Sequence, residues 1–454
     1  MSIVSDIVAF FYLTGSSSGC SRKSSSSGPA NTSSASSATS EPEIPQAAPV
    51  PITLRNECLP VRITSTAQLT QLGCLTGGAA SVNAGIEEVR NNYLGLFGHQ
   101  LGNGTLIVRR PDDFAVSEGI GFGGLIFSAS STAESQAAYW QLYNARNNYF
   151  LQPSGVMAWS LNLDGSVRSS DSASDGDQDW IASELIMLDR VQCGQVNLPD
   201  SLSLTAFRDQ VQRDLNAFWD NHIRERGNRL IFLPTNGTWA QRGDGRDVYY
   251  TNYADPSLLR LFAAFDPAHD WNRLANDVQA LNQEVLQAHS SLGAAGQNPV
   301  PAKVFIQVNS QNFTVENYYE ISRREGVTGD ALVDNEADAI RFFLRQARAA
   351  VLDNDHTAQE NLRQIVQIAR ITDPASAHLY AGAEGAPSPF GWSNTLARAS
   401  YGLAVLGSGD TSSAEAFFCS VMNDRHDAYF GEWAGARDYY YDQSMILQIM
   451  DLAF

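Results

Sequence analysis

The sequence predicts an all-α or mainly α chain with one globular domain of about 400 residues, and three observations lead to this prediction. Apolar residues recur at three- and four-residue steps through most of the body, beginning with Val82, Ile86 and Val89. The links between these stretches carry Gly, Pro, Asn and Asp, which favour turns. Short β-like runs do not alternate regularly with them, so we do not expect a doubly wound parallel sheet.

Two segments precede the globular domain. Residues 1–22 hold a short apolar run from Ile3 to Leu13 and then Cys20, and they resemble an export or lipoprotein signal. The run is too short to span a bilayer. Residues 23–51 are rich in Ser, Ala, Pro and Thr and predict a disordered linker, because they cannot bury enough apolar surface to offset their ordering entropy.

We therefore expect a bacterial protein that is exported and has its catalytic domain at 52–454. It is periplasmic, extracellular, or held at the outer membrane by a lipid on Cys20. Cys58 and Cys74 are close enough in sequence to form a short disulfide after export. Cys193 and Cys419 are expected to be buried small hydrophobic residues or to form a second bridge.

Helical periodicity continues along the domain in a succession of segments. The first covers 82–97, and the others cover 134–150, 178–192, 204–225, 256–288, 335–352, 358–370, 392–405, 412–422 and 436–453. Strand-like runs stand at 105–108 and 304–308. No fixed repeat period is found, which is compatible with a ring of helical hairpins that differ in sequence.

Composition excludes several classes of function. The formal net charge of −19 disfavours nucleic acid as a partner. Lysine occurs only at Lys23 and Lys303, so Schiff-base and P-loop chemistry are not expected. The HExxH and GxxxxGK[ST] motifs are absent and the histidines do not cluster, so we expect no metal. The match Gly119-x-Gly121-x-x-Gly124 to the dinucleotide fingerprint lacks a preceding hydrophobic strand, so we expect no cofactor.

Two acidic motifs carry the strongest functional signal. Glu118 stands in Ser-Glu-Gly-Ile-Gly-Phe-Gly, and Asp175 and Asp177 stand in Ala-Ser-Asp-Gly-Asp. In each motif a carboxylate lies next to glycine, which we expect to leave the acid open to a ligand. Two carboxylates in an aromatic-lined cleft are the minimum equipment for cleaving a glycosidic bond. The alternative for Glu118 is a helix N-terminal position after Ser117 as cap.

The aspartates at 175, 177 and 179 do not form an EF-hand calcium loop, because Trp180 and Ile186 occupy the positions that need Gly and Glu. The helical pattern that follows places them at a helix N-terminus.

A third group contains Asp338, Arg341 and Arg345 on one helix face. Arg341 is expected to keep Asp338 ionised as a general base, and a surface ion pair is the alternative.

These motifs resemble glycoside hydrolase family 8. The resemblance rests on residues 117–123, on Met-Ala-Trp-Ser-Leu-Asn-Leu-Asp-Gly at 157–165 and on Ala-Ser-Asp-Gly-Asp at 173–177, and it spans about 85–450. It implies an (α/α)6 barrel of helical hairpins of the six-hairpin glycosidase type. It also implies inverting hydrolysis of β-1,4-linked glycans, without a cofactor or a metal.

The resemblance also assigns roles to residues. Glu118 matches the general acid and Asp175 the residue that holds the distorted sugar. Asp338, in Ala-Asp-Ala-Ile-Arg, is the best match to the general base. The expected substrate contacts are Trp159, Tyr253, Arg341, Phe122, Asp177 and Trp180. Phe122 replaces the family's tyrosine, Ala337 replaces an aromatic residue, and a Pro-Trp pair is missing.

We therefore expect a monomeric, endo-acting β-1,4-glycanase that inverts the anomeric centre. Cellulose or mixed-linkage β-glucan is the first expected substrate, followed by xylan or chitosan. The altered base motif leaves a second hypothesis, a non-catalytic glycan-binding or exopolysaccharide-assembly protein on the same scaffold. A third is a polysaccharide lyase on a similar helical barrel.

Overall fold

The computed structural model describes residues 78–102, 104–242, 244–292, 300–301, 303–309, 312–317, 336–369, 373–377, 380–381, 386–387, 394–427 and 440–453. All of them lie in one compact unit, Leu54–Phe454. The predicted export segment 1–22, including Cys20, and the predicted linker 23–51 lie outside the described residues, as do Cys58 and Cys74.

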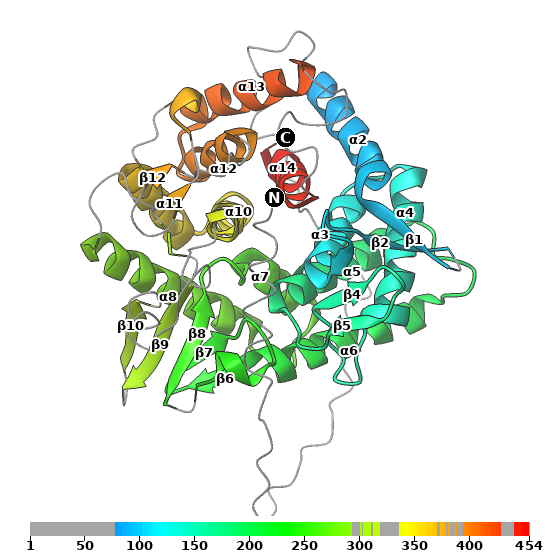
Figure 1. Cartoon of the computed structure of the whole chain (residues 1–454), viewed down its shortest axis with the longest axis horizontal. Coiled ribbons are helices and arrows are strands. Elements are labelled where there is room, and N and C mark those ends of the chain that lie inside the picture. Colours follow the sequence, from blue (N-terminus) through cyan, green and yellow to red (C-terminus); the bar gives the residue numbers. More distant parts are fainter. Residues whose placement is uncertain are drawn as a thin grey trace, which may run out of the picture. The chain divides into compact units, whose positions relative to one another are not determined.

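The described chain is mainly helical, as the sequence predicts. Figure 1 labels its α-helices, which are α2 (Gly78–Phe97), α3 (Ser117–Ser128), α4 (Ala133–Ala145), α5 (Ser174–Gln192), α6 (Leu204–His222), α7 (Pro256–Phe265), α8 (Trp271–Leu292), α10 (Glu336–Leu352), α11 (His356–Ala369), α12 (Asn394–Gly407), α13 (Thr411–Asp427) and α14 (Tyr440–Ala453).

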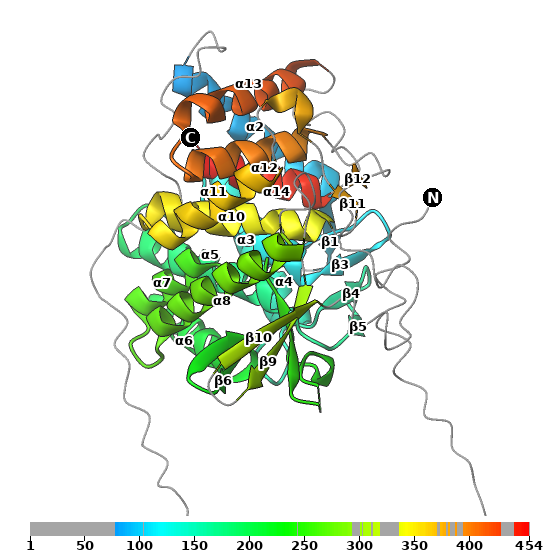
Figure 2. The ribbon, with the colours of Figure 1, turned by 90° about the vertical axis from the view of Figure 1, so that its left-hand side faces the viewer.

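These helices form two concentric layers. Among the described elements, α3, α5, α7, α10, α12 and α14 each contact the next in this order, and α14 contacts α3, which closes an inner ring (Figure 1). Each inner helix also packs on an outer helix, in the same order α4, α6, α8, α11, α13 and α2 (Figure 2). The arrangement is the (α/α)6 barrel of helical hairpins.

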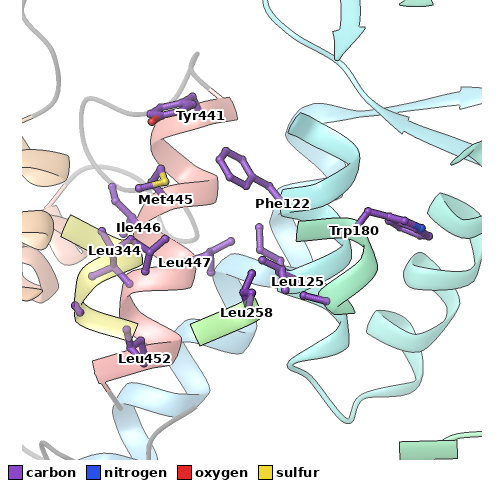
Figure 3. Close-up of a cluster of buried hydrophobic side chains, with 14 of the residues drawn as sticks. Phe122, Leu125, Trp180, Leu258, Leu344, Tyr441, Met445, Ile446, Leu447 and Leu452 are labelled. Atoms are coloured by element: carbon purple, nitrogen blue, oxygen red, sulfur yellow. The ribbon is translucent and has the colours of Figure 1, made fainter. Parts of the chain in front are cut away.

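Burial follows the two layers. The inner helix α5 is buried on every side from Ser174 to Asp189, and α14 is buried along most of its length. The outer helix α6 buries one stripe that includes Phe207, Val211 and Phe218. Figure 3 shows side chains of four inner helices meeting in the core, among them Leu125, Leu258, Leu344 and Leu447.

The strands form small antiparallel sheets at the ends of the helices. They are β1 (Gly98–Leu101) with β2 (Thr105–Val108), β3 (Phe114–Val116) with β4 (Ser160–Asn162) and β5 (Val167–Ser169), β6 (Ile223–Arg226) with β7 (Arg229–Phe232), β8 (Arg246–Tyr250) with β9 (Lys303–Asn309) and β10 (Asn312–Asn317), and β11 (Tyr380–Ala381) with β12 (Ala386–Pro387). The predicted runs at 105–108 and 304–308 are confirmed as β2 and part of β9.

The predicted helical segments are wrong in two places. The segment 256–288 is two helices, because Asp266 ends α7 and its carboxylate accepts hydrogen bonds from the backbone N–H of Ala268 and the indole N–H of Trp271. Helix α3 is missing from the predicted segments. It carries glycine at 119, 121, 123 and 124, and these residues hide the apolar period.

The hairpin topology decides where the helix ends lie. Because each inner helix is followed by an outer helix that returns antiparallel to it, the inner helices run in one direction. Their N-terminal turns therefore gather at the same end of the ring.

Among the described helices, none combines the length and apolar character needed to cross a membrane. Cys193 and Cys419 are each disulfide-bonded, so neither is a free thiol, and their pairing with each other stays a prediction.

A buried carboxyl in α14 gives a pH-dependent prediction. Asp442 is 2% exposed, its Oδ1 has no hydrogen-bond partner among the described residues, and burial raises its pKa to about 7. The folded state therefore keeps a proton that the unfolded chain releases above its lower pKa, so the free energy of unfolding falls as pH rises from about 4 to about 7. Asp442→Asn removes this fall.

We expect the melting temperature of Asp442→Asn, relative to wild type, to be higher at pH 8 than at pH 4, as measured by differential scanning calorimetry. Asp451→Asn is the control, since Asp451 Oδ1 accepts from Arg90 Nη2 at 2.5 Å and its loss breaks a pair. That variant is expected to be destabilised at pH 8. An equal shift for Asp442→Asn at both pH values would contradict the prediction.

Candidate active site

Residues from four inner helices meet where the ring's N-terminal turns gather. Arg341 of α10 places its Nη1 2.6 Å from Glu118 Oε2 of α3, and the same nitrogen donates to Asp175 Oδ2 of α5. The hydroxyl of Tyr440, the first residue of α14, donates to Glu118 Oε1. Residues separated by more than 300 positions in the sequence thus form one charged cluster.

Backbone hydrogen bonds fix the position of Glu118, in addition to the contacts of its side chain. Strand β3 ends at Val116, and the N–H of Ser117 donates to the carbonyl of Trp159 at 2.9 Å. Glu118 lies in the first turn of α3, so its helix N-terminal position is confirmed. Ser117 is not the cap, because the N-cap is Val116 and it provides no side-chain hydrogen bond.

The glycines of the two motifs bring α3 and α5 together. A Cβ on Gly176 would lie 2.7 Å from the carbonyl carbon of Ser117, and one on Gly121 would lie 2.7 Å from the carbonyl oxygen of Gly176. Contacts this short exclude any side chain. The expectation that these glycines open the acids to a ligand is corrected, because they serve the close approach of two helices.

The two carboxylates have different environments. The side chain of Glu118 is 15% exposed, whereas that of Asp175 is 2% exposed. Burial raises the pKa of Asp175, and Asp179 adds to this rise while Arg341 opposes it. Both acids stand in the first turn of a helix, where the helix dipole favours negative charge. Glu118 is therefore the more accessible of the two acids.

Two further arginines of α10 extend the cluster toward the barrel interior. Arg345 binds both oxygens of Asp179, with Nη1 at 2.5 Å and Nη2 at 2.8 Å. Arg348 donates to Asp255, which also accepts from the N–H of Ser257 and caps α7. Helix α10 is thereby tied to α5 and α7 by buried charge pairs.

Aromatic rings surround Arg341. Its guanidinium carbon lies 5.0 Å from the ring centre of Tyr253 and 5.6 Å from that of Tyr441. The half-buried Trp159 lies beside the acid, since its carbonyl accepts from Ser117, and its ring centre is 6.2 Å from that of Phe114. The structure therefore places Tyr253 at Arg341 and the backbone of Trp159 next to Ser117, and the contact of all three with substrate stays a prediction.

Three predicted substrate contacts are corrected by burial. Trp180 is fully buried and stacks on Tyr139 with ring centres 5.6 Å apart. Phe122 is 1% exposed and packs on Tyr441, and Figure 3 shows Phe122 and Trp180 within the hydrophobic cluster. Asp177 is 3% exposed and both of its oxygens are occupied by protein groups. All three have structural roles.

The predicted base lies outside the described side chains. Asp338 is within α10, but only its place in the helix is described. Arg341, the predicted partner of Asp338, contacts Glu118 and Asp175, and its pairing with Asp338 stays a prediction. Sequence reasoning gave no specific role to Tyr440, and the only signal for it was the run of three aromatic residues Tyr439–Tyr441 near the start of the last apolar stretch. In the described residues, His, Cys, Asp and Glu form no group able to hold a metal ion.

Comparisons with known proteins agree with this geometry. No protein-family model matches the chain. Endoglucanase A of Acetivibrio thermocellus is 26% identical over 184 residues, which cover 39% of this chain and 34% of that protein. The chain therefore matches about a third of its curated relative.

Solved structures match over most of the chain. A β-1,3-1,4-glucanase from Paenibacillus sp. X4 has a TM-score of 0.64 at 16% identity, covering 86% of this chain and 95% of its own. A reducing-end-xylose releasing exo-oligoxylanase has a TM-score of 0.58 at 14% identity, covering 83% and 93%. Rex8A from Paenibacillus barcinonensis, as a variant complexed with xylose, has a TM-score of 0.60 at 16% identity, covering 82% and 92%.

These matches agree with the resemblance to glycoside hydrolase family 8. They confirm the fold that it implies, the (α/α)6 barrel of helical hairpins. Within this fold, the first turns of α3 and α5 carry the two acidic motifs, and Arg341 joins them.

The contact between α3 and α5 gives a prediction. Gly176→Ala would place a Cβ against the backbone of Ser117 and Glu118, which has no free rotamer to relieve the clash. We expect the free energy of unfolding to fall by about 1–3 kcal/mol, as measured by urea denaturation.

Gly95→Ala is the matched control, because Gly95 lies in α2 with nothing within 4 Å of an added Cβ. The free energy of unfolding of that variant should rise by roughly 0.5–1 kcal/mol. Equal stability of Gly176→Ala and wild type would show that the two helices are not in close contact.

Proposed function

We propose that the chain is an exported, inverting, endo-acting hydrolase of β-1,4-linked polysaccharide that acts as a monomer. Cellulose or mixed-linkage β-glucan is the first proposed substrate, followed by xylan or chitosan. The observation that carries the proposal is the contact of Glu118 and Asp175 with one nitrogen of Arg341. The names of the matched proteins, which are glucanases and xylanases, support a β-linked glycan as substrate.

Glu118 is the proposed general acid. It is the more exposed of the two carboxyls, so it can approach the glycosidic oxygen of a bound sugar chain. As the bond to the anomeric carbon breaks, the proton of Glu118 passes to the leaving oxygen. Tyr440 and Arg341 hold one oxygen each and so fix the direction of the carboxyl group.

The shared contact with Arg341 allows Glu118 to change between its ionised and its protonated form. A general acid must be neutral before it reacts, and an arginine beside it favours the ionised form. Asp175 contacts the same nitrogen, so the charge of Arg341 stays compensated when Glu118 takes up its proton. The pair of carboxylates on one guanidinium thus allows the acid to be protonated without leaving a buried charge alone.

Asp175 is too close to Glu118 to be the base of an inverting pair. Glu118 Oε2 and Asp175 Oδ2 both contact Nη1 of Arg341, and the longer of these two contacts is 2.6 Å. The two oxygens are therefore at most about 5 Å apart. An inverting pair needs about 6.5–9.5 Å to hold the attacking water. Asp338, three residues before Arg341 in α10, remains the proposed base, and Asp175 the proposed holder of the distorted sugar.

Export is supported by the cysteines as well as by the N-terminal sequence. Cys193 and Cys419 are disulfide-bonded, and disulfides persist in the periplasm and outside the cell. We propose an exported protein with Cys20 as the site of lipid attachment. Radioactive palmitate incorporated by wild type and not by Cys20→Ser is the expected result, and equal incorporation would overturn the anchor.

The test of function is a reducing-end assay on cellulose, mixed-linkage β-glucan, xylan and chitosan. Wild type is expected to release new reducing ends from at least one of them, and Glu118→Gln to lose about 10²–10⁴-fold in kcat. Glu134→Gln is the matched control, since Glu134 occupies the same second position of α4 and is exposed. If Glu118→Gln is as active as wild type, Glu118 is not the general acid.

The anomeric form of the first product decides between two chemistries. Proton NMR during early turnover is expected to detect the inverted α-anomer. Retention of the β-anomer would make Asp175 a nucleophile, in keeping with its short distance to Glu118. Oligosaccharide binding without new reducing ends would favour a glycan-binding protein, and products absorbing in the ultraviolet would favour a lyase.

A further inference from the structure

The motif that carries Asp175 carries a second carboxylate with a different set of contacts. Asp177 Oδ1 accepts from the N–H of Met157 at 2.9 Å, and Asp177 Oδ2 lies 3.2 Å from Nε2 of His222. Because an ionised carboxylate can only accept, the ring N–H of His222 is the donor. Both oxygens of Asp177 are occupied by these contacts and His222 is fully buried, so neither side chain is open to a polysaccharide.

Met157 begins a segment in which three successive N–H groups have protein acceptors. The N–H of Ala158 donates to the carbonyl of Phe150 at 2.8 Å, and that of Trp159 donates to the carbonyl of Asp171 at 2.7 Å. Asp177 is the only one of the three acceptors that is a side chain. A substitution can therefore remove this one bond and leave the other two in place.

The end of the same segment holds the acid. The carbonyl of Trp159 accepts from the N–H of Ser117, the residue before Glu118. Strand β4 continues from Ser160 and pairs with β3, with Ser160 opposite Val116. A shift of Met157 is therefore transmitted through two peptide units to the backbone that carries Glu118.

Helix α6 anchors the other side of the pair. His222 is the last residue of α6, and its carbonyl accepts from the N–H of Leu233 at 2.8 Å. The ring of His222 packs on Phe218 with centres 5.0 Å apart. His222 thus connects an outer helix to the first turn of α5, and its orientation is set by packing.

We propose that Asp177 and His222 form a positioning pair that sets the place of Glu118 through the backbone of Met157–Trp159. The inference rests on the proposed function of Glu118. In this arrangement one helical turn of α5 does three things. Asp175 binds Arg341, Gly176 lies against Ser117, and Asp177 holds the segment to which Ser117 is bonded.

The first test is kinetic. Asp177→Ala removes the acceptor of Met157, so Glu118 loses its fixed place and kcat is expected to fall about 10–100-fold with KM nearly unchanged. Asp177→Asn keeps an oxygen for Met157 and should retain kcat within a few-fold of wild type. The kcat of His222→Leu should lie between those of Asp177→Ala and Asp177→Asn. A similar loss in Asp177→Asn and Asp177→Ala would assign the effect to charge and overturn the positioning role.

A second histidine–carboxylate pair provides the matched control. His269 Nδ1 lies 2.7 Å from Asp266 Oδ2, at the junction of α7 and α8. His269→Leu removes a similar pair that makes no contact with Met157–Trp159. It is expected to lower thermal stability and to keep kcat measured well below the melting temperature. Equal kcat loss in His269→Leu and His222→Leu would overturn the proposal.

The second test does not depend on activity. Hydrogen–deuterium exchange should be faster in Asp177→Ala at the N–H groups of Met157 and Ser117, and unchanged in Asp177→Asn. If wild type cleaves no glycan, the proposed function fails while this measurement still tests the pair. If Asp177→Ala does not fold, His222→Leu provides the exchange and kinetic data. Protected Met157 and Ser117 amides in a folded variant that lacks the pair would overturn the inference.

Discussion

Arg341, Arg345 and Arg348 lie four and three residues apart on α10, so they form one stripe that faces the neighbouring inner helices. Their partners are Glu118 and Asp175, then Asp179, then Asp255, which come from α3, α5 and α7. Each guanidinium is buried, and removing one partner of a buried pair typically costs about 3–5 kcal/mol. The inner ring therefore depends on these charges matching, and the candidate site is the exposed end of the stripe.

The same constraint explains why the site is both buried and charged. Desolvation raises the pKa of Asp175, and Arg341 opposes that rise. The helix dipoles of α3 and α5 act in the same direction as Arg341, because both acids stand in first turns. Parallel inner helices bring these first turns to one end of the ring. The chemistry of the site thus follows from the hairpin topology and needs no additional element.

Periodicity predicted much of the fold because amphipathic outer helices such as α6 show their buried stripe in the sequence. It failed at α3, where glycines needed for contact with α5 dilute the apolar pattern, and at Asp266, which ends α7 within an apolar stretch. The acidic motifs predicted the place of Glu118 and Asp175. Local spacing gives no sign that Arg341 contacts Glu118 and Asp175 of other helices, or that Tyr440 contacts Glu118.

The Ala-Ser-Asp-Gly-Asp motif shows why neighbouring residues of one type acquire different roles. Successive side chains of a helix point about 100° apart, so Asp175, Gly176 and Asp177 face three different surroundings. Asp175 meets a cation, Gly176 meets a backbone, and Asp177 meets an amide and a ring. From the resemblance both aspartates were expected to contact substrate. The helix geometry gives the two aspartates different roles. Together with Gly176, they make this turn of α5 the part of the barrel that places Glu118.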